Sequence, residues 1–147
     1  MNALKLLEED HDRFKKLLEE GAETTERARV GRAELFETLS RELQIHERME
    51  EEVLYPALKN HEKAKDIVLE GYEEHHVADL IVGELAETDT TDETWAAKWS
   101  VLKESLEHHI EEEEHDMFKK ARKIFEDEEL EEMGAAMEAI RAAERGR

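Results

Sequence analysis

A short motif, a histidine with a glutamate four residues later, occurs twice in this chain, at His46 and Glu50 and again at His109 and Glu113. In both copies a leucine stands three residues before the histidine, and an apolar-aromatic pair closes the motif. Residues four apart lie one turn apart on one face of an α-helix. Each copy therefore offers an imidazole and a carboxylate to one point in space, as metal ligands do.

Both motifs lie on the apolar stripe of their expected helices. Steps of three and four residues lead from the two histidines to Leu39, Leu43, Val53, Leu102 and Leu106. A glutamate on a buried stripe is costly unless it is paired, protonated or bound to a cation. Glu50 and Glu113 stand at equivalent places, which favours one buried cationic centre that satisfies both.

Two further histidines fall on core positions. His11 follows Leu4 and Leu7 and precedes Phe14 at helical spacing. Taken alone, it reads as a core imidazole satisfied by a hydrogen bond. Beside two His/Glu pairs, the interpretation as a ligand is favoured.

The second of these positions offers two adjacent histidines. Periodicity places His75 among Val68, Tyr72, Ala78 and Val82, and rotates His76 toward the flank of the stripe. His75 is therefore the preferred ligand and His76 the alternate. Asp79, one turn after His75, is expected on the inner side, as a further ligand or as an acceptor that orients an imidazole.

The pattern predicts an all-α fold, an antiparallel up-down-up-down four-helix bundle with a short additional C-terminal helix. Asn2 is the expected N-cap of the first helix, Pro56 is expected to kink or end the second, and Thr90 and Glu93 could form a capping box for the fourth. The C-terminal helix either covers one end of the bundle or meets a partner. The four bundle helices are expected at about 3–28, 32–58, 63–87 and from 94 onward, within a single domain 1–147 that comprises a bundle of about 1–122 and an amphipathic helix of about 128–145.

Composition restricts the chemistry. The net charge of −20 disfavours nucleic acid and anionic lipid, and no apolar run approaches the ~20 residues of a membrane span. The chain has no cysteine, which leaves histidines and carboxylates as the strong ligands. A cytoplasmic protein is the expected class, without nucleic-acid or membrane partners.

Two similar halves, each supplying His, His and Glu, predict a pair of metal ions. Glu50 and Glu113 would bridge them, with one ion held by His11 and His46 and the other by His75 and His109. Bridged ions lie about 3.5–4 Å apart. A ferritin-like site is the rival arrangement, because Glu8/His11, Glu73/His76 and Glu112/His115 match Glu-x-x-His, but its last two pairs leave the apolar stripe.

The chain resembles the hemerythrin-like, or HHE cation-binding, domain family. The resemblance covers about residues 1–120 and rests on His11 after Glu9-Asp10, the two His-x-x-x-Glu motifs, and Glu74-His75-His76. It implies a non-haem di-iron centre with an oxo or hydroxo bridge. Oxygen-carrying hemerythrin has a histidine where this chain has Asp79, and some family members use the acid after the second-helix histidine, here Glu47, as a further ligand.

Three functions follow as hypotheses. The first is a protein that binds or senses oxygen, peroxide or nitric oxide, or senses iron. The second is a redox enzyme of peroxide-dismutating or ferroxidase type, and the third is a structural or metal-buffering bundle. The cofactor implied is two iron ions, although histidines and carboxylates also accept Mn or Zn. A protein partner or a homodimer could use the C-terminal helix.

Overall fold

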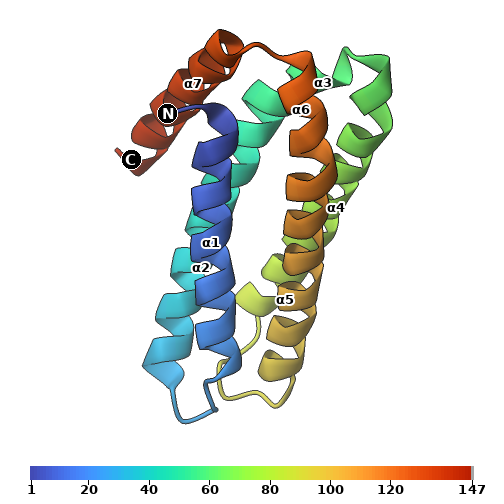
Figure 1. Cartoon of the computed structure of the whole chain (residues 1–147). Coiled ribbons are helices and arrows are strands. Elements are labelled where there is room, and N and C mark those ends of the chain that lie inside the picture. Colours follow the sequence, from blue (N-terminus) through green and yellow to red (C-terminus); the bar gives the residue numbers. More distant parts are fainter. Residues whose placement is uncertain (147) are drawn as a thin grey trace.

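Four long helical segments run antiparallel, with successive segments joined at opposite ends (Figure 1). The computed structural model describes residues 1–146, and no β-strand occurs among them. The predicted all-α, up-down-up-down bundle is confirmed. Its segments are α1 (Ala3–Ala22); α2 (Arg29–Met49) continued by η1 (Glu50–Leu54) and α3 (Tyr55–Lys59); α4 (Glu62–Ala86); and α5 (Thr94–Glu112) continued by η2 (Glu113–Met117) and α6 (Phe118–Ile124), followed by the separate helix α7 (Asp127–Arg145).

The first helix begins as predicted and ends early. The Asn2 side chain accepts a hydrogen bond of 2.9 Å from the backbone N–H of Lys5, as an N-cap does. The helix stops at Ala22 rather than near residue 28, and α2 begins at Arg29 rather than Arg32. The Thr24 hydroxyl donates to the Gly21 carbonyl, and the Arg32 side chain donates to the Thr24 carbonyl. These side chains satisfy backbone carbonyls that a further helical turn would otherwise bond.

The expected capping box before the fourth segment is absent. The residue before α5 is Glu93, whose side chain makes no capping bond. Instead, the Asp89 and Asp92 carboxylates accept from the backbone N–H groups of Thr91 and Thr94, both at 2.8 Å. Aspartate side chains, and not Thr90, therefore satisfy the backbone N–H groups before α5, because an aspartate carboxylate reaches the N–H group two residues further along the chain.

The second segment passes through Pro56 without ending there. A π-helical turn, η1, starts at Glu50, and the N–H of Tyr55 donates to the Glu50 carbonyl five residues back. Pro56 then falls in the first turn of α3, where a missing N–H is tolerated. The matching turn η2 starts at Glu113 and contains no proline. Both π turns therefore begin at the glutamate of a repeated motif.

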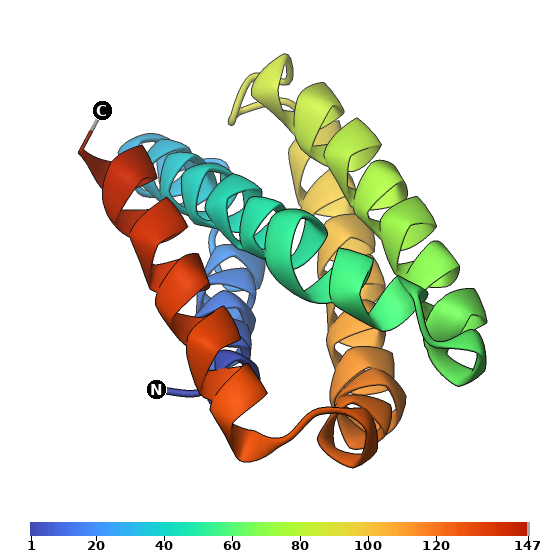
Figure 2. The ribbon, with the colours of Figure 1, turned by 90° about the horizontal axis from the view of Figure 1, so that it is seen from above.

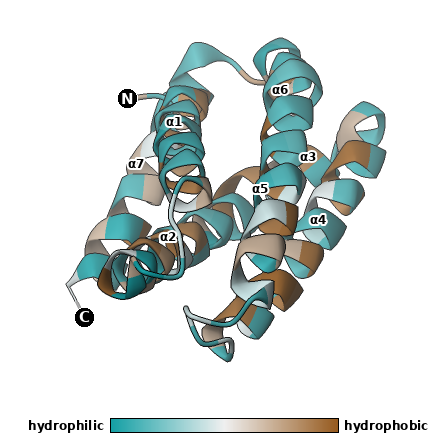
Figure 3. Cartoon of the chain, turned by 90° about the horizontal axis from the view of Figure 1, so that it is seen from below, coloured by the Kyte–Doolittle hydropathy of each residue, from teal (hydrophilic) through white to brown (hydrophobic). Residues whose placement is uncertain are grey.

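Two apolar layers enclose the middle of the bundle. One contains Leu4, Leu7, Tyr55 and Phe118, and the other contains Phe14, Leu18, Leu102 and both tryptophans, Trp95 and Trp99, which are core residues as predicted. Much of the ribbon is hydrophilic (Figure 3), although Leu69, Val77 and Leu80 of α4 are exposed. The candidate ligands lie in the polar level between these layers.

The C-terminal helix α7 packs along α1 and α2 on one flank of the bundle (Figure 2). Its Leu130 and Met137 are buried. A Cβ at Gly134 would lie 2.0 Å from the Met1 carbonyl oxygen, so only glycine permits this close approach of α7 to the start of α1. The helix therefore covers a side of the bundle rather than one end.

Candidate metal centre

Six side chains from four helical segments converge at the level of the two π turns. His11, His46, Glu50 and Glu113 form one group, and Glu50, His75, His109 and Glu113 form a second. Within each group one potential ligand atom per residue lies within 4.8 Å of all the others. The two groups share Glu50 and Glu113, and all six side chains are buried. These are the six residues, and the division between two positions, expected from the sequence.

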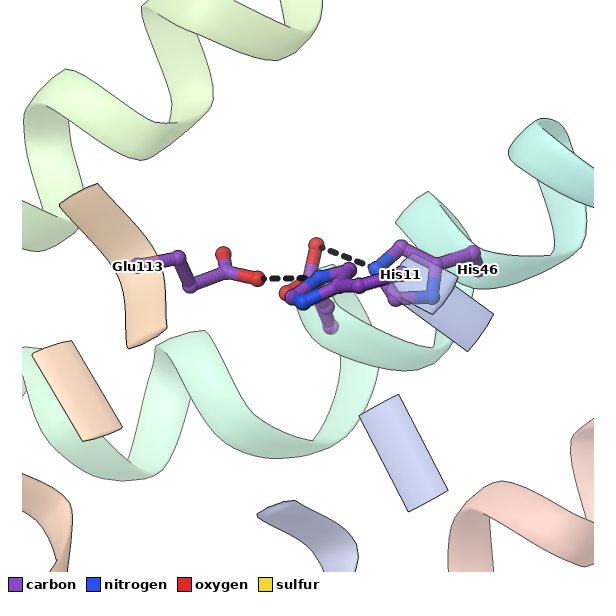
Figure 4. A group of neighbouring side chains, drawn as sticks. His11, His46 and Glu113 are labelled. Atoms are coloured by element: carbon purple, nitrogen blue, oxygen red, sulfur yellow. Dashed lines mark ion pairs between the residues drawn. The ribbon is translucent and has the colours of Figure 1, made fainter. Parts of the chain in front are cut away.

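The Nε2 atom of each imidazole faces a central glutamate. His11 Nε2 lies 3.0 Å from Glu113 Oε1, and His109 Nε2 lies 3.2 Å from Glu113 Oε2. Figure 4 shows Glu113 directed at the His11 ring, with His46 beside it. Nε2 of His75 and of His46 lie 3.0 and 3.4 Å from Glu50 Oε1. Each glutamate therefore touches histidines of both halves.

The Nδ1 atom of each imidazole meets a carboxylate behind it. His46 pairs with Asp10 at 2.8 Å and His109 with Glu74 at 2.7 Å. His11 pairs with Glu114 and His75 with Glu51, both at 2.7 Å. A carboxylate at Nδ1 fixes the ring orientation and the tautomer that leaves Nε2 available as a ligand. All four rings are thus oriented for coordination through Nε2.

The arrangement is two-fold in character. Asp10 and Glu74 precede His11 and His75 in the chain, and each serves the other histidine of its own half. Glu51 and Glu114 follow Glu50 and Glu113, and each serves a histidine of the opposite half. Sequence reasoning missed these four carboxylates, although each stands beside a predicted ligand. Their regular placement in the sequence, each directly beside a predicted ligand, is the feature by which they could have been identified.

Several inward atoms lack a hydrogen-bond partner. In residues 1–146, Nε2 of His11 and of His109, Oε2 of Glu50 and Oε1 of Glu113 are buried without a hydrogen bond of suitable geometry, although both nitrogens lie close to Glu113 oxygens. Buried polar atoms are normally satisfied, and orphaned ones call for an ion or a water. Imidazole nitrogens and carboxylate oxygens around one small volume fit a pair of first-row metal ions.

Protons compete with such ions for the imidazole nitrogens. Burial lowers the pKa of His11, but Glu113 and Glu114 outweigh it and raise the pKa to about 9. Burial likewise lowers the pKa of His75, which Glu50 and Glu51 raise to about 10. The pKa of Glu113 lies well below its usual range because His109 and its other partners outweigh burial. Without metal, protonated imidazoles therefore balance the buried carboxylates.

Tyr55 adds a hydroxyl to the site. Its OH donates to Glu113 Oε2 at 2.6 Å and lies 3.4 Å from His75 Nε2. Burial and the nearby Glu113 and Glu50 carboxylates raise the Tyr55 pKa well above 10, so the phenol stays protonated. Tyr55 stands at the end of the first motif in the sequence, but its contact with Glu113 joins α3 to η2 and follows only from the tertiary structure.

The remaining candidates lie apart from the two groups. Asp79 is exposed rather than on the inner side, and the acceptor at His75 Nδ1 is Glu51. Glu47 is buried, and burial together with the neighbouring Asp79 raises its pKa to about 9. Glu47 and Asp79 line a cleft of about 490 Å³. Neither belongs to the two groups, so their role as ligands stays a prediction.

The other histidines point to solvent. His76, the alternate to His75, is exposed, as are Glu73 and His115 of the rival Glu-x-x-His pattern. A ferritin-like ligand set is therefore not assembled. His108 is exposed too, and with Glu74 and Glu112 it forms a third, superficial group of possible ligands.

Comparisons with known proteins identify the family and support the fold. The hemerythrin HHE cation binding domain model matches residues 2–121. A hemerythrin HHE cation binding domain-containing protein from Mycobacterium kansasii has a similar crystal structure, with a TM-score of 0.86 and 32% sequence identity. The alignment covers 99% of this chain and 88% of that one. A search of curated proteins found no match. The chain belongs to the hemerythrin HHE cation binding domain family.

Proposed function

We propose that this chain is a non-haem di-iron protein that binds or senses a small oxidant such as oxygen, peroxide or nitric oxide. The observation that carries the proposal is the double His/Glu group, in which buried Nε2 and carboxylate atoms lack hydrogen-bond partners while every Nδ1 is held by a carboxylate. His11 and His46 would hold one ion and His75 and His109 the other. Glu50 and Glu113 would bridge the two.

Membership of the family favours iron, and the donor set accepts iron as it also accepts Mn or Zn. Four imidazoles and two carboxylates are borderline and hard ligands, and the chain has no thiolate to select a soft metal. When bound, two iron ions would supply the binding or reduction of small oxidants. The protein's own part is to hold the rings, exclude bulk water and provide two carboxylates. Among the described helices, none is long and apolar enough to cross a membrane.

Metal analysis with spectroscopy tests the proposal. The protein should bind about two iron ions per chain and show near-ultraviolet absorption from a bridged ferric pair. The spectrum should change on addition of oxygen, peroxide or nitric oxide to the reduced protein. Tight binding of zinc or manganese with no stable iron form would shift the conclusion to a structural or metal-buffering bundle.

Tyr55 favours a second candidate, a redox enzyme of peroxide-dismutating type. Such an enzyme needs an acid beside the reacting centre. Tyr55 is a protonated hydroxyl, in hydrogen-bond contact with a bridging candidate, Glu113, and near His75. Sustained gas evolution from excess peroxide would establish turnover, whereas one spectral change per site without gas would establish binding alone.

A further inference from the structure

The C-terminal helix reaches the candidate metal centre through one arginine. Arg141 of α7 donates from Nη2 to Asp10 Oδ2 at 2.5 Å. The same carboxylate oxygen lies 2.8 Å from Nδ1 of His46. A continuous polar chain therefore runs from α7 through α1 to a histidine on α2. Its far end is the Nε2 atom that faces Glu50.

This connection exists at one of the four histidines. The Asp10 side chain is 2% exposed, whereas Glu74, Glu114 and Glu51 are 27, 30 and 40% exposed. Asp10 also accepts from Arg13 at 2.7 Å. Within residues 1–146, the ion-pair partners of the other three carboxylates are histidines and include no arginine or lysine. Asp10 therefore differs from the other three supporting carboxylates in its burial and in its arginine partners.

Burial explains why Asp10 needs these arginines. Asp10 is almost completely buried, and the guanidinium groups of Arg141 and Arg13 contact its two oxygens and compensate a charge that water does not reach. A buried carboxylate held by two guanidinium groups has few alternative positions, because arginine presents a rigid fork of donors. The more exposed glutamates have water as an alternative partner and can leave their imidazoles.

We propose that Arg141 is a positioning residue through which α7 fixes His46, so that the His11/His46 position holds its ion more tightly than the His75/His109 position. This inference rests on the proposed dinuclear site. α7 begins after residue 121, where the match to the family model ends. The close contact of Gly134 with the Met1 carbonyl oxygen fixes the position of the helix along α1.

Chelator-driven metal release tests the role of Arg141. Wild-type protein loaded with two iron ions should release them in two phases, a fast one from His75/His109 and a slow one from His11/His46. Arg141→Ala should accelerate the slow phase about 10- to 100-fold, the usual effect of losing a group that orients a ligand, and leave the fast phase unchanged. Arg141→Lys should restore part of the difference. Arg145→Ala, which removes an arginine of the same helix that pairs with Glu42 and not with Asp10, is the matched control and should behave as wild type.

A spectroscopic readout separates positioning from general stability. In zinc-loaded protein, the Nδ1–H proton resonance of His46 should shift in Arg141→Ala, while that of His109 stays in place. Asp10→Asn keeps the volume but removes the charge, and should accelerate the slow phase even if Arg141→Ala folds poorly.

Two outcomes would overturn the inference, and they are distinguishable. Equal release rates in Arg141→Ala and Arg145→Ala, with two ions bound, would refute the role of Arg141 and leave the dinuclear site intact. Failure of wild-type protein to hold two ions of any metal would refute the dinuclear site and the inference together.

Discussion

Tyr55 and Phe118 occupy equivalent places in the two halves of the bundle, each nine residues after a candidate histidine ligand. Tyr55 stacks on His75 with ring centroids 5.3 Å apart, and Phe118 stacks on His11 at 5.9 Å. Only Tyr55 carries a hydroxyl, which it donates to Glu113. The two candidate metal positions are therefore alike in their potential ligands and different in their surroundings.

Tyr55→Phe should keep metal content near wild type, because the phenol belongs to neither ligand group. It should lower stability by about 1.5–3 kcal/mol, since the bond to the charged Glu113 is lost. If the protein is an enzyme, turnover of peroxide should fall about 100-fold or more. Elemental analysis, thermal unfolding and oxygen evolution measure the three effects. Loss of both metal ions would instead make Tyr55 a ligand.

His109→Ala should remove most of the metal and destabilise the protein by about 3–5 kcal/mol, because Glu113 loses a partner while it stays buried. His46→Ala should act in the same way through Glu50. The control is His115→Ala on the exposed face of η2, which should change neither metal content nor melting temperature. Full metal occupancy in either core variant would contradict the site assignment.

The metal-free protein should lose stability as pH rises above neutrality. His11 and His75 have folded-state pKa values of about 9 and 10 against an ordinary 6.5, so between these limits the native state binds more protons than the unfolded chain. Their contribution is complete below pH 6.5 and is lost as the pH passes 9 to 10. Glu47, with a pKa of about 9, acts in the same direction.

Denaturant unfolding of the metal-free protein between pH 6.5 and 10 checks this slope. Bound metal should reduce this pH dependence of stability, because coordination replaces the protons on Nε2. For the same reason, metal affinity should weaken as the pH falls. A free energy of unfolding that stays flat or increases over this range would contradict the prediction.

Gly134→Ala should destabilise the protein by about 1–3 kcal/mol, the usual cost of overpacking, because its Cβ would lie 2.0 Å from the Met1 carbonyl oxygen. Gly83→Ala is the matched control, since its Cβ would meet nothing within 4 Å. That control should stabilise α4 by about 0.5–1 kcal/mol. Chemical denaturation of both variants gives the comparison, and equal effects would show that α7 does not depend on the close approach.

The candidate ligands could be recognised from the sequence because helical periodicity is local. A histidine and a glutamate four residues apart share a face whatever the helix packs against, and the apolar neighbours of His11 and His75 identify the buried face in the same way. Two matched halves then imply one shared centre. For the same reason, the number and order of the bundle helices followed from the pattern.

Contacts between helices required the tertiary structure. The pairing of His46 with Asp10, and of Asp10 with Arg141, joins three helices, and no spacing along one helix specifies such a partner. Asp79, one turn after His75, was predicted on the inner side, but the packing of α4 leaves it exposed. The sequence determined which side chains face inward, through the fixed period of the helix. The packing of whole helices decided which carboxylate supports each imidazole, because that choice depends on distances between segments far apart in the chain.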